Sequence, residues 1–594
     1  MNLSVNGRTL SVKPGQTILA VLKDHGFKIP TLCDHPDLVN KATCRVCVVE
    51  VKGEKHLLTA CSTLAREAMV ILTNSPRVQK ARRLNLELLF AEHAEKCTSC
   101  SLIYDCELLR LAKEYKIKIN RFSDRKSRRK TYRFANAVEI DGSQCIDCQN
   151  CLAVCRDLQA IDYLRLVGTG SDQEVKPRRE VGAACVYCGQ CVLHCPVAAA
   201  QEQAQWPAVE KLLKEKKLVA LAQLAPAVRV SLGEEFGLPP GEDATGKCYT
   251  ALKKLGFQHV FDINFGADIT TLTEAEELVR RLKDKKAVFP LTTSCCPSWV
   301  AYAEFYHPEL LPHLTTARSP HMHLAGAIKS YWAKKQGLNS RRLAVVSIVP
   351  CTAKKYEAGR PELKYKGRPL VDYVLTTREL AYLLKKRKID FKSLPDTAGE
   401  KLFNAGSGAA AIYGASGGVM ESALRTAAYL LAKEGKGGQG KKKKQTAISL
   451  PLEFKAVRGL SGLKEATVKL AGRRLKLGVV NGLGQLKKIR LRFKDYHYLE
   501  VMACPGGCLG GGGQPPTTAA IRRQRAAGLY AIDAKKTVRR AHENEAMMSY
   551  YNWVKKKGLA KKLLLTKYKG RSAPGVTMVS KVPRPVFSFF RERR

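Results

Sequence analysis

Short hydrophobic runs with the period of β-strands dominate the beginning of the chain. Leu3–Val5, Thr9–Val12 and Arg45–Val51 are alternating or β-rich, and they predict a small N-terminal sheet domain. The stretch Arg82–His93 has instead the apolar spacing of a helix. The longest apolar runs, such as Leu218–Ala225, are far shorter than the ~18 residues that cross a bilayer, so no membrane span is expected.

In the second half, short apolar or β-rich runs alternate with helical patterns, which predicts an α/β arrangement. Three of these runs are Ala287–Leu291, Leu343–Val349 and Tyr498–Met502, and each is followed by a loop that contains cysteine. Binding sites in such sheets lie beyond the carboxyl ends of the strands. We therefore expect the three loops to bring their cysteines to one crevice.

The length of 594 residues is enough for about four domains of ~100–200 residues each. The first residues, Met1–Gly7, lack the basic start and apolar stretch of a secretion signal. A cytoplasmic location is therefore expected. Disulfides are disfavoured in such a reducing compartment, so the 21 cysteines are better explained as metal ligands.

The charge is strongly positive, with 101 Lys and Arg against 53 Asp and Glu, a formal net charge of +48. This excess would attract polyanions or acidic proteins, unless it reflects a general preference for basic residues on solvated faces. Two basic clusters, Lys116–Arg133 and Lys433–Lys444, are predicted to be exposed loops, and the second resembles an insertion. Neither interleaves aromatic residues that could stack on bases, so nucleic acid is not the expected partner.

Two cysteine motifs have the spacing of a two-cluster ferredoxin. Both have the pattern C-x2-C-x2-C-x3-C, and they begin 40 residues apart, at Cys145 and Cys185. In such pairs the fourth cysteine of each motif binds the other cluster, whereas zinc sites usually pair two separated C-x2-C motifs. One 4Fe-4S cluster is therefore assigned to Cys145, Cys148, Cys151 and Cys195, and a second to Cys185, Cys188, Cys191 and Cys155.

Two further ligand sets precede these motifs. Cys33, Cys44, Cys47 and Cys61 lie among the β-rich segments, and a 2Fe-2S cluster is the preferred interpretation, with zinc as the alternative. The next set is His93, Cys97, Cys100 and Cys106, which offers one imidazole and three thiolates to a third 4Fe-4S cluster. A histidine at the end of a helix is otherwise an ordinary surface or capping residue. Several clusters in series predict an electron relay.

The loops of the second half resemble the three signature motifs of the iron-only (FeFe) hydrogenases. The motifs are Thr293-Ser294-Cys295-Cys296-Pro297-x-Trp299, Pro350-Cys351-x2-Lys354-x2-Glu357 and Glu500-Val501-Met502-x-Cys504-x3-Cys508-x2-Gly511-Gly512-Gly513-Gln514-Pro515. The order of the N-terminal clusters is also similar to that of the large multi-cluster members. The resemblance covers essentially the whole chain and implies the reversible oxidation of H2 to protons and electrons.

The resemblance further implies an H-cluster, a 4Fe-4S cubane joined through a cysteine sulfur to a di-iron unit with CO, cyanide and a bridging dithiolate that contains an amine. By motif position the cubane ligands are Cys296, Cys351, Cys504 and Cys508, with Cys508 as the bridge. Lys354 would hydrogen-bond a cyanide. Backbone contacts would come from Ser294 and Pro350, packing against the di-iron ligands from Met502, and proton shuttling from Cys295. The glycines that follow Cys508 are expected to let the backbone approach a cofactor closely.

The family's proton path corresponds to Glu274, Thr315 and Glu277 in this chain. Glu274 and Glu277 are three residues apart on a predicted helix and therefore share a face, and Thr315 stands where the family has serine. The chain departs from many members at four positions near the di-iron unit, with effects expected on rate, bias and oxygen sensitivity: Ser298, His321, Val349 and Tyr413, in place of Gly, Gln, Met and Phe.

The expected fold is multidomain, with α+β and α/β parts. It comprises a β-grasp 2Fe-2S domain (1–78), a His/Cys3 4Fe-4S domain (79–120), a ferredoxin-like two-cluster domain (121–205), a two-lobed α/β catalytic domain with the site between the lobes (206–528), and a small C-terminal wrapping region with a basic tail (529–594). Past Arg571 the chain is expected to be loosely ordered.

The expected partners are ferredoxin, which suits the positive charge, or flavin-containing, NAD(P)-reactive subunits, together with maturation enzymes that install the di-iron unit. The chain has no dinucleotide fingerprint, so a nicotinamide site would belong to another subunit. Two rival interpretations are an electron-transfer subunit of the complex I or formate dehydrogenase type and a hydrogen sensor. The first would not need the three signature motifs, and the second would carry an added signalling domain.

Overall fold

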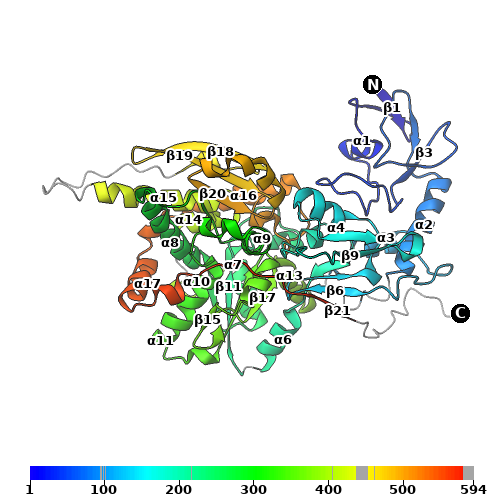
Figure 1. Cartoon of the computed structure of the whole chain (residues 1–594). Coiled ribbons are helices and arrows are strands. Elements are labelled where there is room, and N and C mark those ends of the chain that lie inside the picture. Colours follow the sequence, from blue (N-terminus) through cyan, green and yellow to red (C-terminus); the bar gives the residue numbers. More distant parts are fainter. Residues whose placement is uncertain are drawn as a thin grey trace.

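A computed structural model describes residues 1–93, 97, 100, 102–215, 217–403, 406–435, 453–460 and 462–579. Figure 1 shows the N-terminal sheet domain at one end, the following cysteine-rich region beside it, and the second half of the chain as the largest body. Within these ranges, no helix combines the length and hydrophobicity needed to cross a bilayer.

The N-terminal domain is the small mixed sheet that the hydrophobic pattern predicts. Its elements are β1 (Asn2–Val5), β2 (Arg8–Ser11), α1 (Ile18–Asp24), β3 (Val48–Val51), β4 (Leu58–Thr59) and β5 (Val70–Leu72). The strand order is β2-β1-β5-β3-β4, with β1 and β5 parallel, and α1 buries its apolar residues on the domain core. The predicted fold of the N-terminal 2Fe-2S domain is confirmed.

Two helices follow, α2 (Pro76–Ala91) and α3 (Glu107–Glu114). The Ser75 side chain caps α2 by accepting a hydrogen bond from the Val78 amide, and Pro76 occupies the first turn, where its missing N–H costs nothing. The predicted helix therefore starts earlier than the sequence pattern indicated and ends two residues before His93.

A four-stranded sheet, with order β10-β7-β6-β21, underlies the two ferredoxin motifs. Short helices α4 (Asn150–Ala153) and α5 (Gln190–Leu193) carry the third cysteine of each motif, and a hairpin packs nearby. The remaining elements of this region are β6 (Thr131–Phe134), β7 (Val138–Asp141), β8 (Leu164–Val167), β9 (Glu174–Pro177), β10 (Ala200–Glu202) and β21 (Val576–Val579).

The basic cluster Lys116–Arg133 is mostly the exposed loop that its charge predicts, with two of its basic residues as buried exceptions. Lys126 and Arg129 are buried, and the segment ends in β6. The Lys126 ammonium lies 2.8 Å from Glu92 and 2.9 Å from Asp147, while Arg129 pairs with Asp147. Ion pairing with carboxylates from other elements makes this burial possible.

The end of the chain also differs from expectation. Val576–Val579 forms β21, which pairs antiparallel with β6 at the edge of the ferredoxin sheet. Residues expected to be loose after Arg571 therefore tie the C-terminal region to the cysteine-rich domain, because an unpaired sheet edge offers its backbone groups to any extended segment. The greater part of the Lys433–Lys444 cluster and the last fifteen residues lie outside the described residues.

The largest body contains two separate sheets, which form the two predicted lobes. The first has order β12-β11-β14-β17 and is fully parallel; the second has order β13-β20-β19-β18, with β18 antiparallel to its neighbour. The strands are β11 (Val219–Leu224), β12 (His259–Asp262), β14 (Leu343–Val349), β17 (Tyr373–Thr376), β13 (Leu291–Thr292), β18 (Leu463–Leu470), β19 (Arg473–Asn481) and β20 (Tyr498–Met502).

Long buried helices join these two sheets. The central one, α8 (Ile263–Lys283), packs against α10 (Pro320–Ala327) and α15 (Gly418–Gly435). Close approach to α10 requires Gly266, where a Cβ would lie 2.1 Å from the Pro320 carbonyl oxygen. Helix α8 is buried along most of its length. Its polar side chains, such as Glu274 and Glu277, therefore lie inside the protein rather than in solvent.

Candidate active site

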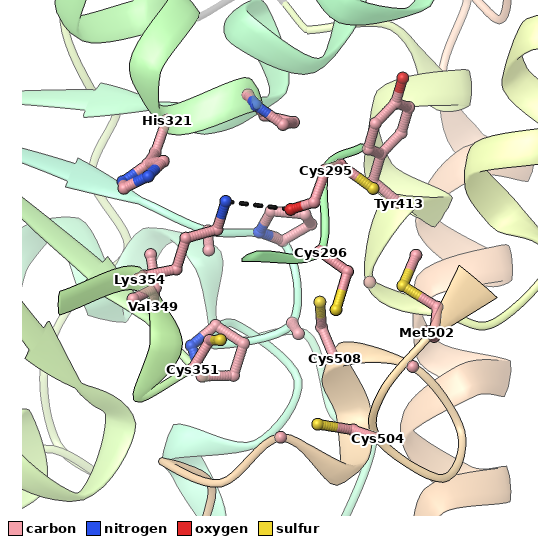
Figure 2. A pocket seen from close by; sticks show the side chains of 18 of the residues that line it. Cys295, Cys296, His321, Val349, Cys351, Lys354, Tyr413, Met502, Cys504 and Cys508 are labelled. Atoms are coloured by element: carbon pink, nitrogen blue, oxygen red, sulfur yellow. Dashed lines mark hydrogen bonds between the residues drawn. The ribbon is translucent and has the colours of Figure 1, made fainter. Parts of the chain in front are cut away.

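The three predicted cysteine loops meet at the carboxyl ends of β13, β14 and β20 (Figure 2). They surround one cavity. Its lining includes Cys295, Cys296, Pro350, Cys351, Lys354, Met502, Cys504 and Cys508, as well as Ser298, His321, Val349 and Tyr413. The expectation that strand ends from different parts of the chain deliver cysteines to one crevice is thus confirmed.

The donor set fits an iron–sulfur cubane. Cys296, Cys351, Cys504 and Cys508 approach one another from three loops, and their thiols are close enough to influence one another electrostatically. Cys296 caps helix α9 (Pro297–Tyr306), whose first residue is a proline suited to that position. Thiolates are the ligands that iron–sulfur clusters require, and the cavity beside the four cysteines offers space for a further group.

The glycines after Cys508 allow close packing of protein against protein, beyond the close approach to a cofactor that was expected. A Cβ at Gly512 would lie 2.5 Å from the Cα of Gly189, in the second ferredoxin motif, and one at Gly513 would lie 2.6 Å from the Thr376 Cβ. The Gln190 side-chain amide also donates to the Gly510 carbonyl, at 2.8 Å. The loop that carries Cys504 and Cys508 is therefore pressed against the cysteines of the ferredoxin domain.

Lys354 projects into the cavity from helix α12 (Ala353–Ala358). Its ammonium donates to the Cys295 carbonyl at 3.0 Å and to Glu357 at 2.7 Å. Glu357 is one turn further along α12, so the helix itself places the two side chains on one face. Burial opposes the charge of Lys354, but the adjacent carboxylate raises the pKa of this lysine above its ordinary value.

Cys295 lies beside the four clustered cysteines, and Figure 2 shows its thiol on the side of Tyr413 and Met502. Burial, followed by the nearby carboxyl groups of Glu274 and Glu500, raises the pKa of the Cys295 thiol well above its ordinary value. The group is therefore held as S–H, a form that can donate a proton.

Glu274 is fully buried on α8, in electrostatic range of Cys295. Burial raises the pKa of Glu274 to about 8, although the Tyr498 hydroxyl donates to one of its oxygens at 2.6 Å. The other oxygen, Oε2, has no hydrogen-bond partner among the described residues. A buried carboxyl that is protonated at neutral pH and has one oxygen open to a water or a thiol can pass protons on.

Glu277 lies one turn further along α8 and is held by many donors. It accepts hydrogen bonds from the Thr315 hydroxyl at 2.9 Å, the Thr316 amide at 2.9 Å and the Arg281 guanidinium at 2.7 Å. Glu274, Glu277 and Thr315 are therefore brought together beside the cavity, as the resemblance implied. None of the three lines the cavity itself.

Of the other predicted site residues, some line the cavity and some lie behind its wall. Met502 and Pro350 line the cavity, whereas the Ser294 side chain donates to the Ala317 carbonyl at 2.8 Å and does not line it. Among the departures from the family, the Tyr413 hydroxyl is satisfied by Thr271 at 2.8 Å. Sequence reasoning did not identify Tyr498 or Arg281; the position of Arg281, four residues after Glu277 on a helix, is a signal that could have done so.

Family comparisons agree with this geometry along the chain. The family described as "Iron only hydrogenase large subunit, C-terminal domain" matches residues 218–512, and "Iron hydrogenase small subunit" matches 519–571. The NADP-reducing hydrogenase subunit HndD of Solidesulfovibrio fructosivorans is 40% identical, over 93% of this chain and 95% of the relative. The chain belongs to the iron-only hydrogenase family. It is an oxidoreductase that acts on H2.

One further sequence relative and one solved structure are also similar to this hydrogenase. Iron hydrogenase 1 of Clostridium pasteurianum is 37% identical over 95% of this chain and 99% of that protein. Among solved structures, an apo [FeFe]-hydrogenase from Chlamydomonas reinhardtii is 35% identical and superposes with a TM-score of 0.51, covering 61% of this chain and 99% of that one. The solved structure therefore matches about three fifths of the chain, whereas the two sequence relatives match almost all of it.

The N-terminal part of the hydrogenase also matches iron–sulfur families. A "2Fe-2S iron-sulfur cluster binding domain" matches residues 1–76, and an "NADH-ubiquinone oxidoreductase-G iron-sulfur binding region" matches 82–121. In the first, the Cys47 and Cys61 sulfurs are 3.2 Å apart, and Cys33 and Cys44 form a second hydrogen-bonded pair. Four thiols are thus clustered, as a 2Fe-2S cluster requires.

His93 of the hydrogenase is buried, and its Nδ1 lies 2.9 Å from the Gln144 carbonyl oxygen. A hydrogen bond from one ring nitrogen to a backbone carbonyl is the usual arrangement when the other nitrogen binds a metal. The thiols of Cys97, Cys100 and Cys106 influence one another electrostatically, and Cys106 caps α3. The geometry is compatible with the predicted His/Cys3 set.

The last cysteine of each ferredoxin motif lies in electrostatic range of the other motif's cysteines, the arrangement that the predicted exchange of ligands needs. Cys195 interacts electrostatically with Cys145 and Cys148, and Cys155 does so with Cys185 and Cys188. Cys148 is buried and the other five are partly buried, and desolvation raises the pKa of each thiol. Thiols grouped in this way offer the cysteine ligands that 4Fe-4S clusters use.

Proposed function

We propose that this hydrogenase catalyses 2H⁺ + 2e⁻ ⇌ H2 in both directions, at an H-cluster held by Cys296, Cys351, Cys504 and Cys508. The observation that carries the proposal is the meeting of these four cysteines, from three separate loops, around a cavity that Lys354 and Cys295 also line. The bound group would supply the iron at which the H–H bond forms or breaks and the amine to which protons are delivered.

The residues that line the cavity would bind the di-iron ligands, exclude water and deliver protons. The Lys354 ammonium, which donates to the Cys295 carbonyl, would offer a hydrogen bond to an anionic ligand of the di-iron unit. Met502 and Pro350 would exclude water from that ligand sphere. Cys295, held as a thiol, would hand a proton to the amine and be reprotonated from the protein side.

Reprotonation would follow the polar groups of α8. Glu274 would give its proton to Cys295 through a water at the open Oε2 atom, and Glu277 and Thr315 would connect Glu274 toward the surface. Arg281 would hold Glu277 in place. Each group in this path would pass one proton on and take up another, so the groups return to their starting state while the path delivers one proton at a time.

Electrons would travel through one 2Fe-2S and three 4Fe-4S clusters, held by the ligand sets that begin at Cys33, His93, Cys145 and Cys185. Cys33, Cys106 and Cys148 belong to one hydrophobic core, which supports a short path between three of the four proposed sets. The Tyr187 carbonyl, inside the last set, accepts a hydrogen bond at 2.8 Å from Thr352, the neighbour of Cys351. The last cluster would therefore adjoin the H-cluster.

We infer that the electron partner is an NAD(P)-linked, flavin-containing subunit. The 40% identity to an NADP-reducing hydrogenase subunit over almost the whole chain supports this inference. An acidic ferredoxin is the second candidate, because the net charge of +48 would attract it. Binding that weakens steeply with added salt would favour the ferredoxin.

Hydrogen evolution from reduced methyl viologen tests the proposal, with anaerobic protein matured to contain the di-iron unit. Wild type should turn over, and Cys295→Ala should lose at least ~100-fold in rate, because a positioned acid contributes 10²–10⁴-fold. Infrared bands of CO and cyanide should remain in both proteins. Bands without turnover in the wild type would indicate a sensor; no bands, beside a successfully matured control hydrogenase, would leave an electron-transfer protein.

A further inference from the structure

His321 forms part of the cavity wall, although no motif includes it (Figure 2). It lies in the first turn of α10 and is 1% exposed. Its Nε2 is 2.8 Å from Glu357, the carboxylate that holds Lys354. The side chain therefore reaches the ammonium of Lys354 through one shared acceptor.

The orientation of the His321 ring is fixed from two sides. Because the Glu357 carboxylate can only accept, Nε2 carries the hydrogen and Nδ1 is the acceptor. Nδ1 lies 3.1 Å from the Ser347 hydroxyl, which in turn accepts from the Gln223 side-chain amide. Burial and the Lys354 charge lower the pKa of His321 to about 4, so the ring is a neutral donor.

On its other side Glu357 lines a second, smaller cavity together with Arg318 and Arg360. Arg360 is already paired with Glu304, at 2.8 Å. The Nη1 atom of Arg318, by contrast, has no hydrogen-bond partner among the described residues, although the side chain is buried. A guanidinium with an unsatisfied N–H would draw a carboxylate toward it.

We propose that His321 is a positioning residue, which holds Glu357 against Lys354 and away from Arg318. Glu357 in turn keeps the Lys354 ammonium directed into the cavity, on the Cys295 carbonyl. The inference deepens the proposed function and rests on it in one respect, namely that Lys354 faces the di-iron unit. Its structural part, the direction in which Glu357 points, does not depend on any bound group.

Three variants test this role. His321→Ala removes the donor without breaking the helix, and His321→Gln keeps an N–H that can reach Glu357. His323→Gln is the matched control: it is equally buried on the same helix, but its nitrogens bond Thr270 and the Leu564 carbonyl instead. A general effect of replacing a buried histidine in α10 should appear in all three.

Two measurements test the role of His321: a crystal structure, which does not depend on the proposed function, and an infrared and activity measurement, which does. In crystals of protein without the di-iron unit, His321→Ala should turn Glu357 toward Arg318 and break the contact between Lys354 and the Cys295 carbonyl. In matured protein, His321→Ala should shift or split a cyanide infrared band and lower turnover roughly 10–100-fold, as loss of a supporting hydrogen bond does at metal sites. His321→Gln should restore a single band at the wild-type position, and His323→Gln should not move it.

An unmoved Glu357 in His321→Ala would overturn the proposal, and so would an unchanged cyanide band. Equal shifts in His323→Gln would also overturn it. If matured wild type lacked CO and cyanide bands altogether, the proposed function would fail, while the crystal comparison would still decide how Glu357 is held.

Discussion

At the scale of single residues, the buried carboxyl groups of α8 distinguish this site from a simple cluster-binding pocket. Glu274 keeps its proton at neutral pH because burial raises its pKa to about 8. Its Oε2 atom lacks a partner among the described residues, which is costly unless a water or a thiol occupies that position. A residue with a proton to give and an open acceptor is more suited to transport than to structure.

Replacing Glu274 by glutamine should therefore stop proton delivery without dismantling the site. Glutamine keeps the shape and can still accept from Tyr498, but it cannot release a proton at this pH. We expect hydrogen evolution to fall at least ~100-fold while the CO and cyanide bands remain. The measurement is turnover with reduced methyl viologen beside an infrared spectrum of the same sample.

Glu276→Gln provides the control on the same helix. Glu276 points away from the site, where it binds Tyr551 at 3.0 Å and Lys555 at 2.9 Å. Glu276→Gln should leave the rate of hydrogen evolution within about a factor of two of wild type. A partly exposed ion pair contributes only ~0–1 kcal/mol to stability, and this one does not contact the reacting atoms. Equal losses in both variants would show that Glu274 acts through the stability of α8 rather than through its proton.

At the scale of elements, the sequence predicted those features whose cause is local. Strand ends, the helix that carries Glu274, and the cysteine loops follow from hydrophobic period and motif spacing. The basic segment around Lys126 could not be predicted in the same way, because the carboxylates that allow its burial, Glu92 and Asp147, come from other elements. The strand Val576–Val579 was missed for a related reason: its partner β6 is more than 400 residues earlier.

Lys126 should be structurally important, whereas its neighbour Lys130 should not. The Lys126 ammonium also donates to the Cys145 carbonyl at 2.8 Å, so it joins the segment to a cluster ligand. Lys126→Met leaves Glu92 and Asp147 with one cation fewer and should destabilise the protein by about 3 kcal/mol. Lys130 is exposed, and Lys130→Met should change stability by no more than about 0.5 kcal/mol.

Anaerobic denaturant unfolding, followed by iron release to a chelator, measures both variants. The prediction is that Lys126→Met releases iron at clearly lower denaturant concentration than the wild type and Lys130→Met. Identical release curves for the two variants would mean that the ion pairs of Lys126 add nothing to the net stability of this region, as can happen when burial cancels attraction.

At the scale of the whole molecule, the cysteine-rich domains adjoin the body that contains the cavity. The N-terminal sheet domain, the ferredoxin domain and the two-lobed body follow one another in Figure 1. Contacts at Gly512 and Thr352 press the last ferredoxin motif against the catalytic loops. The ligand sets could be predicted from spacing alone, but the closeness of these two regions could not, because it depends on glycines whose neighbours lie more than 160 residues away.

The central claim is that H2 is activated at the cysteine-lined cavity, independently of the relay and of any partner. Exchange of D2 with the protons of water tests this most directly, because it needs no net electron transfer. Matured wild type should form HD, and Cys508→Ala, which removes the proposed bridge, should not. HD formation by Cys508→Ala at the wild-type rate, or none by wild type that shows CO and cyanide bands, would contradict the account.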